Sequence, residues 1–300
     1  MKTNFRAVSY SFGPAVCAVL FIASSARAQN LFEADDGTGA IYQYTPGGVR
    51  SALVTPLLQE AHDLAFDSSG NLFASVEVNG AYFIDKFTTS GTSVFASGLE
   101  FPTGLAFDSA GDLFVADTTA GDIYEYTPAG VRSTFATGLT RPSQLAFNSS
   151  GNLFVTDRIG AEITEITPGG VKSTFATGVM NPYGLAFNSA GDLFVGSQGA
   201  DDIYEYTPGG VRSTFATGVD GPFGLAFNSA GNLFVVAAGA GDIYEYAPDG
   251  TRSTFFSGSP EFGVENIGLA FQGVSLPVPE PGAVALAGLG GAVLWLRRRK

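Results

Sequence analysis

The sequence predicts an all-β protein, a six-bladed β-propeller built of four-stranded antiparallel blades. The tripeptide Leu-Ala-Phe recurs at intervals of 40 to 44 residues, beginning at Leu64, Leu105, Leu145, Leu185, Leu225 and Leu269. A Leu-Phe pair follows each of the first five copies by about eight residues, then come an Ile-Tyr-Glu-Tyr-like segment and Arg-Ser-Thr-Phe. Four short strands in about 40 residues, with no helical period between them, are typical of a propeller blade.

Turn residues bound each expected strand, as in residues 108–111 and 208–210. The chain enters the repeat at a second strand (30–35) and leaves it on a first strand (268–272). Because these two segments together complete one blade, we expect the C-terminal strand to join the N-terminal blade and close the ring. The alternative, a solenoid, would need capping segments that the sequence lacks.

Both ends of the chain have the composition of targeting segments. Residues 1–28 predict a signal peptide, with Lys2 and Arg6, an apolar run over 15–25 and Ala-Arg-Ala before the expected cleavage point. The alternative, an N-terminal membrane anchor, needs a longer apolar run. The single cysteine, Cys17, lies inside this segment. The mature chain therefore has no disulfide, thiol nucleophile or cysteine metal site.

The body of the chain is strongly acidic. Residues 29–278 hold 8 basic and 27 acidic side chains, a formal net charge of −19. Such a surface repels phosphate backbones, so nucleic acid is excluded as a partner. Solubility is the simplest role for the charge, and attraction of cations or basic partners is the alternative.

The unit from Pro102-Thr103-Gly104-Leu105-Ala106-Phe107 to Asp117 resembles an NHL repeat and, more loosely, the SMP-30/gluconolactonase-like propellers. The resemblance covers residues 30–273, and we expect the propeller domain to span 29–273. It implies the fold and leaves the function open, because one fold hosts many activities.

The C-terminal region resembles a PEP-CTERM sorting signal. A linker (274–278) is followed by Pro279, Glu280 and Pro281, an apolar stretch (282–296) and a basic tail, so that 279–300 forms the signal. The resemblance implies processing by an exosortase in a Gram-negative bacterium that makes exopolysaccharide. As a helix, the apolar stretch would span about 22 Å, less than a hydrocarbon core of roughly 30 Å. We expect transient inner-membrane anchoring by this single helix, with the basic end cytoplasmic; a permanent anchor is the alternative.

The position before the glycine of Gly-Leu-Ala-Phe should line the mouth of the central channel. In the gluconolactonase-like family this position supplies Glu, Asn and Asp metal ligands. Here it is occupied by His62, Thr103, Ser143, Tyr183, Phe223 and Ile267. Because this set contains no carboxylate, the sequence predicts no metal site and no cofactor. A displaced site that uses neighbours such as Asp63 or Asn181 is the alternative.

The candidate binding residues are those expected on the face that carries this mouth. They are His62, Asp63, Phe101, Thr103, Ser143, Tyr183, Phe223 and Phe262. No catalytic residue is predicted, and the third-strand tyrosines are expected to pack between blades. The leading hypothesis is a non-enzymatic binding or structural module on the cell surface or in the extracellular matrix, with exopolysaccharide or another surface protein as candidate partners. The alternative is a lactonase-, hydrolase- or lyase-type enzyme that uses His62.

Overall fold

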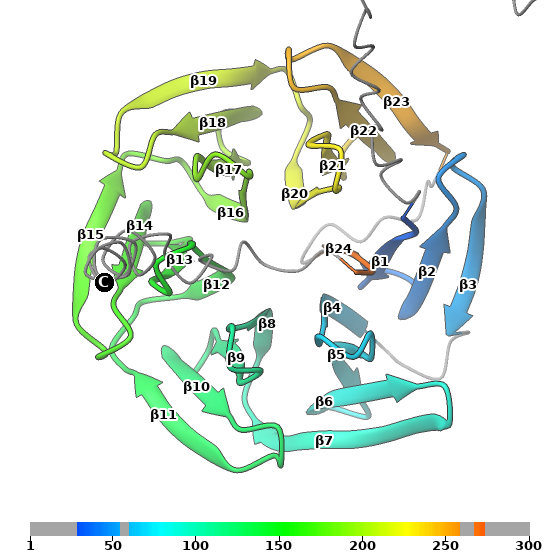
Figure 1. Ribbon diagram of the computed structural model, residues 1–300, viewed down its shortest axis with the longest axis vertical. Coiled ribbons are helices and arrows are strands. Elements are labelled where there is room, and N and C mark those ends of the chain that lie inside the picture. The colour runs from blue at the N-terminus through cyan, green and yellow to red at the C-terminus, as the bar shows by residue number, and fades with distance from the viewer. Residues whose placement is uncertain (1–28, 55–59, 259–266, 274–300) are drawn as a thin grey trace, which may run out of the picture.

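The computed structural model describes residues 29–54, 60–258 and 267–273. Within them, six four-stranded antiparallel sheets surround a central axis (Figure 1). Three sheets, from axis to rim, are β24 (Gly268–Phe271), β1 (Leu31–Asp35), β2 (Ala40–Tyr44) and β3 (Arg50–Val54); β4 (Glu60–Phe66), β5 (Leu72–Val78), β6 (Ala81–Thr88) and β7 (Gly91–Leu99); and β8 (Pro102–Phe107), β9 (Leu113–Asp117), β10 (Asp122–Tyr126) and β11 (Arg132–Ala136).

The other three sheets repeat this order around the ring. They are β12 (Pro142–Phe147), β13 (Leu153–Asp157), β14 (Glu162–Ile166) and β15 (Lys172–Thr177); β16 (Pro182–Phe187), β17 (Leu193–Ser197), β18 (Asp202–Tyr206) and β19 (Arg212–Thr217); and β20 (Pro222–Phe227), β21 (Leu233–Ala237), β22 (Asp242–Tyr246) and β23 (Arg252–Ser257). The predicted six-bladed architecture is confirmed for the described residues.

Burial falls from the second strand of each blade to the rim. Every residue of β9 is buried, whereas the first three residues of β11 are exposed. A second strand has a sheet neighbour on each edge and a blade on each face, so it is apolar almost throughout. A fourth strand forms the outer edge, where the polar Arg-Ser-Thr sequence faces water.

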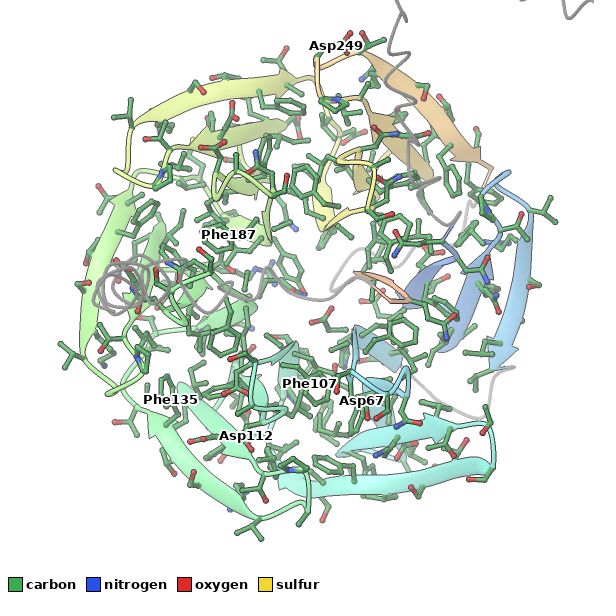
Figure 2. The ribbon with its side chains drawn as sticks, in the orientation of Figure 1. Asp67, Phe107, Asp112, Phe135, Phe187 and Asp249 are labelled. Carbon is green, nitrogen blue, oxygen red and sulfur yellow. The ribbon has the colours of Figure 1, made fainter. Side chains whose placement is uncertain are left out.

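Stacked phenylalanines join each blade to the next. Phe114 of β9 meets Phe135 of its own blade and Phe147 of the following blade, each with ring centroids 4.9 Å apart in edge-to-face geometry. The same three-ring contact recurs at Phe73, Phe154, Phe194 and Phe234. Figure 2 labels three of the rings, Phe107, Phe135 and Phe187. The phenylalanines of the Leu-Phe and Leu-Ala-Phe segments therefore pack neighbouring blades against each other.

The third-strand tyrosines pack as predicted. Tyr126 and Tyr206 are buried against Phe95 and Phe175, the fourth-strand rings of the preceding blades. The other tyrosine of each strand lies under a rim arginine, as Tyr124 does beneath Arg132 at 4.8 Å. Their ring faces are thus already covered.

The two ends of the propeller meet in one sheet. β24 pairs antiparallel with β1, with Leu31 opposite Phe271 and Ala34 opposite Gly268, and Figure 1 shows the orange β24 beside the blue β1. β24 ends at Phe271, one residue before the predicted end. The expected signal peptide (1–28), linker (274–278), sorting motif and apolar helix (282–296) lie outside the described residues.

Candidate functional site

The six positions expected at the channel mouth are buried side chains. His62, Tyr183 and Ile267 are 0% exposed, and Phe223 is the most exposed member of the set at 5%. Thr103 and Ser143 are equally enclosed, at 1% each. The side chains at these six positions therefore pack against one another and against neighbouring blades.

The close approach of the first strands explains this burial. A Cβ built on Gly104 would lie 2.0 Å from the carbonyl oxygen of Ser143, and one on Gly184 would lie 2.0 Å from that of Phe223. Only glycine fits where a neighbouring backbone comes so near. Two blades depart from this pattern, since Asp63 and Gln144 occupy the glycine position.

Asp63 ties three blades together near the axis. Its Oδ2 accepts a hydrogen bond from the backbone N–H of Leu105 (2.7 Å), and its own N–H donates to Ser75 Oγ (3.0 Å). The side chain of Gln144 also contacts its carboxyl and donates through Nε2 to the carbonyl of Thr103 (3.3 Å). Burial raises the pKa of Asp63 to about 7 despite these hydrogen bonds. Sequence reasoning missed Gln144, although its replacement of the repeat glycine was a visible signal.

His62 lies in an aromatic cluster. Its ring centroid is 5.1 Å from that of Phe101 and 6.2 Å from that of Tyr82. Burial lowers the pKa of the imidazole to about 4, so the ring is neutral at pH 7. Glu60 Oε2 lies 3.5 Å from Nε2, and with a neutral imidazole this contact is not an ion pair.

The rest of the ring divides into a polar part and an apolar part. The Thr103 hydroxyl contacts that of Thr118 (2.5 Å), which donates to the carbonyl of Pro142 in the next blade (2.6 Å). On the apolar side, Tyr183 and Phe223 stack edge to face at 5.0 Å within a cluster that includes Ile267. Phe262, the remaining candidate, lies outside the described residues.

The aspartates that end second strands hold loops. Asp117 accepts hydrogen bonds from the backbone N–H groups of Glu100 and Phe101, both at 2.8 Å. Asp157 does the same for Thr140 (2.7 Å) and also accepts from Gly160 (2.9 Å). These carboxylates therefore cap loop backbone N–H groups, which is a structural role.

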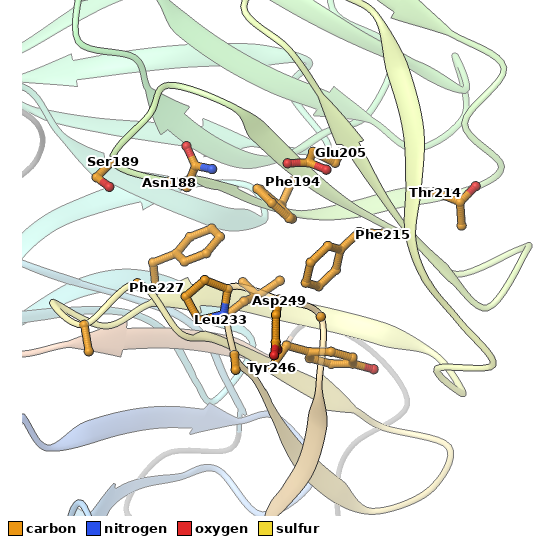
Figure 3. Close-up of a pocket in the computed structure, with 15 residues that line it drawn as sticks. Asn188, Ser189, Phe194, Glu205, Thr214, Phe215, Phe227, Leu233, Tyr246 and Asp249 are labelled. Carbon is orange, nitrogen blue, oxygen red and sulfur yellow. The ribbon is translucent and has the colours of Figure 1, made fainter.

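A pocket of about 440 Å³ lies between the blade β16–β19 and the blade β20–β23 (Figure 3). Phe194, Phe215 and Phe227 form its apolar walls, with Asn188 and Glu205 on one side. In two other blades an asparagine donates to the equivalent glutamate, as Asn152 Nδ2 does to Glu165 (2.6 Å) and Asn232 Nδ2 to Glu245 (2.6 Å). In the blade β16–β19 the position of this asparagine is occupied by Asp192, whose carboxylate cannot donate a hydrogen bond to Glu205. Sequence reasoning missed this pocket because two separate repeats form it.

Two further findings concern the described residues alone. They contain no group of three or more His, Cys, Asp and Glu side chains arranged to hold a metal ion. None of their segments forms an apolar helix of membrane-spanning length.

Sequence comparison assigns the C-terminal end of the chain. Residues 277–300 match the PEP-CTERM protein-sorting motif. PEP-CTERM signals are processed by exosortases, so the motif supports export and association with the cell envelope. No curated protein matches the chain by sequence.

Several solved structures share the propeller fold of this chain. A chain of a nidogen/laminin complex is 20% identical, with a TM-score of 0.72, over 81% of this chain and 98% of that one. Virginiamycin B lyase from Staphylococcus aureus is 18% identical, with a TM-score of 0.59, over 72% and 77%. A protein assigned as a gluconolactonase is 16% identical, with a TM-score of 0.59, over 68% and 80%. At these identities the likeness shows the fold alone.

Proposed function

We propose that this protein is an exported, non-catalytic binding or structural propeller on the cell surface or in the extracellular matrix of a Gram-negative bacterium. The observation that carries the proposal is the filling of the axial ring with buried side chains that bond or pack to neighbouring blades. The PEP-CTERM motif supports delivery to the envelope. Exopolysaccharide or another surface protein is the proposed partner.

In this proposal the two ends of the chain direct export and sorting of the protein. Residues 1–28 act as a cleaved signal peptide, and 282–296 form a short helix that anchors the protein until an exosortase acts at Pro279-Glu280-Pro281. The propeller (29–273) follows the signal peptide, and the linker (274–278) joins it to the sorting signal (279–300). The pairing of β24 with β1 supports the further proposal that the C-terminal strand closes the ring.

The chemistry of the ring supports a non-catalytic role. The hydroxyl groups of Thr103 and Thr118 are engaged with each other and with the next blade. Asp63 bonds to the backbone of Leu105. A general base or nucleophile must reach substrate, and these groups are turned into the protein.

A lactonase-, hydrolase- or lyase-type activity is the second candidate, and one observation favours it. Neither imidazole nitrogen of His62 has a hydrogen-bond partner in the part of the chain that the structure describes, and Glu60 lies 3.5 Å from Nε2. A neutral imidazole beside a carboxylate is the arrangement in which a histidine accepts a proton as a general base.

The experiment that separates the two uses the full-length chain in detergent micelles. Hydrolysis of lactones and esters and elimination from a lactone substrate are measured with and without Ca²⁺, Mg²⁺, Mn²⁺ or Zn²⁺, in wild type and His62→Ala. We expect no turnover above the variant and no micromolar metal binding by calorimetry. Metal-dependent turnover that is lost in His62→Ala would establish the enzyme instead.

A further inference from the structure

The pocket between the blades β16–β19 and β20–β23 combines buried apolar walls with an exposed edge (Figure 3). Phe194 and Leu233 line it and are only 4% and 1% exposed. Ser189, Thr214 and Asp249 line it as well and are exposed to solvent. A pocket of about 440 Å³ has the size of a small-molecule site, and its exposed edge lets a ligand enter.

This pocket is separate from the axial ring. It includes residues of the hairpin between β16 and β17 and of the hairpin between β22 and β23. Because successive strands of a blade run antiparallel, both kinds of hairpin lie at the same end of the blades. His62 and Tyr183 lie near the start of first strands, which is the opposite end. A ligand in the pocket would therefore make no use of the axial candidates.

Four aromatic side chains line the pocket in a continuous row. Phe194 meets Phe215 and Phe227 edge to face, each with ring centroids 5.0 Å apart, and Figure 3 shows these two rings on either side of it. Phe215 in turn lies 5.5 Å from Tyr246. Aromatic rings attract cations, and their apolar surface also suits the methylene groups that carry an ammonium.

The charged groups of the pocket are acidic. Glu205 lines it from one blade and Asp249 from the next, and the described lining residues include no lysine or arginine. The carboxylate of Glu205 accepts one long hydrogen bond, from Ser213 Oγ (3.4 Å). The amide of Asn188 donates to Asp192 instead (3.0 Å). The carboxylate of Glu205 therefore keeps acceptor capacity for a cationic donor.

Two departures from the repeat add negative charge at this pocket. Asp192 replaces the asparagine that bonds to the glutamate in the blades β12–β15 and β20–β23. Asp249 stands in a hairpin position that is glycine or alanine in four other blades, so the turn does not require an acid there. Asp112 repeats the first replacement, but Gly169 then occupies the second position in the following blade. In the sequence the two acids therefore come together only at this pocket.

The blade β4–β7 shows which group fits beside the central ring of such a contact. Lys86 on β6 is the cross-strand partner of Phe73, just as Glu205 on β18 is the partner of Phe194. The ammonium of Lys86 lies 4.9 Å from the centre of the Phe73 ring and 3.8 Å from Asp67 Oδ2, in the hairpin between β4 and β5. That blade supplies its own ammonium to a ring and an acid. The pocket presents the equivalent ring with acids, and the cation must come from a ligand.

We propose that the pocket between the blades β16–β19 and β20–β23 binds a primary alkylammonium group. The ammonium lies between the Glu205 carboxylate and the Phe194 ring, and its methylene groups lie against the other aromatic side chains. The inference rests on the proposed binding function and names a place and a ligand chemistry for it. A free diamine and a lysine side chain of another surface protein share this chemistry.

The test is calorimetric titration of the full-length chain in non-ionic detergent micelles with cadaverine, and micelles alone serve as the blank. Pentanediol is the neutral match with the same carbon chain, and glutarate is the corresponding dianion. We expect saturable binding of cadaverine that weakens as the salt concentration rises, because the edge of the pocket is exposed to solvent. Pentanediol and glutarate should bind more weakly.

Three variants separate the pocket from the general acidity of the chain. Glu205→Gln should bind cadaverine roughly tenfold more weakly, as for loss of a charge-assisted hydrogen bond. Asp192→Asn should also weaken binding, because the new amide would donate to Glu205 as Asn152 does to Glu165. Asp112→Asn changes the net charge by the same amount in another blade and should match wild type.

Glu205→Lys is an independent variant, because it places an ammonium where Lys86 has one in its own blade. It should fold, as judged by a melting temperature near that of wild type, and it should abolish cadaverine binding. The same titration with an acetylated lysine amide separates the two sources of the ligand. Binding of this amide that depends on Glu205 indicates a lysine of a partner protein, and binding of cadaverine alone indicates a free diamine.

The proposal is overturned by any of four results. They are the absence of saturable cadaverine binding, equally tight binding of pentanediol, wild-type affinity in Glu205→Gln, and a loss of affinity in Asp112→Asn as large as in Asp192→Asn. None of these results bears on catalysis. Turnover that is lost in His62→Ala would instead refute the non-catalytic function, and it is measured without cadaverine.

Discussion

Removal of β24 should destabilise the whole propeller. A chain that ends at Gly263 lacks this strand, whereas a chain that ends at Gly273 keeps it and lacks the same sorting tail. β24 buries the side chains of Leu269 and Phe271, which are 8% and 7% exposed, and its four residues pair with β1. Its loss also uncovers one edge of β1, all five residues of which are buried.

The size of the effect follows from these contacts. Burial of a leucine or phenylalanine side chain contributes about 1.5–3 kcal/mol, and each ladder hydrogen bond contributes about 1 kcal/mol net. Two such side chains and about two to four ladder hydrogen bonds amount to roughly 5–10 kcal/mol, a large part of the stability of about 5–15 kcal/mol expected for a domain. For a domain of this size the melting temperature should fall by roughly 10 °C or more.

The assay is thermal unfolding of the two truncated chains, followed by circular dichroism, with light scattering to detect aggregation through the uncovered edge. The chain that ends at Gly263 should melt lower and aggregate earlier. Equal melting temperatures for the two chains would refute the closure of the ring by β24.

Three further outcomes are expected. Glu33 is 0% exposed and hydrogen-bonded by Tyr44, and burial raises its pKa to about 8. The folded state therefore keeps the Glu33 proton, which the unfolded state loses above pH 4.5, so the free energy of unfolding falls as pH rises from about 4.5 to 8. The melting temperature of Glu33→Gln should therefore rise further and further above that of wild type over this pH range. Gly184→Ala should cost about 1–3 kcal/mol in urea unfolding, since its Cβ meets the Phe223 carbonyl, and an unchanged midpoint would contradict the close approach. Alanines at Pro279-Glu280-Pro281 should leave export intact and stop tail removal, and mass spectrometry showing a processed tail would contradict exosortase recognition there.

The strands were predictable because their signals are local. Leu-Phe and Leu-Ala-Phe recur at a fixed spacing, and alternation with turn residues sets the strand bounds to within a residue or two, as at β1 and β24. The inter-blade role of Tyr126 and Tyr206 was also predictable, since a tyrosine that recurs at the same position in four of the six blades serves a contact that those blades share. The PEP-CTERM tail was also predictable from local sequence, because its three parts follow one another along the chain.

The candidate site was predictable only as a set of positions. The sequence placed His62 and Tyr183 near the axis, but their burial depends on how closely neighbouring first strands approach, which no single repeat encodes. The raised pKa of Asp63 and the pocket between the blades β16–β19 and β20–β23 likewise arise between blades. By itself the sequence determined the repeat, the strands and the sorting signal. Tertiary structure decided which polar groups are buried and which face one another, because these properties depend on contacts between residues some 20 to 40 positions apart.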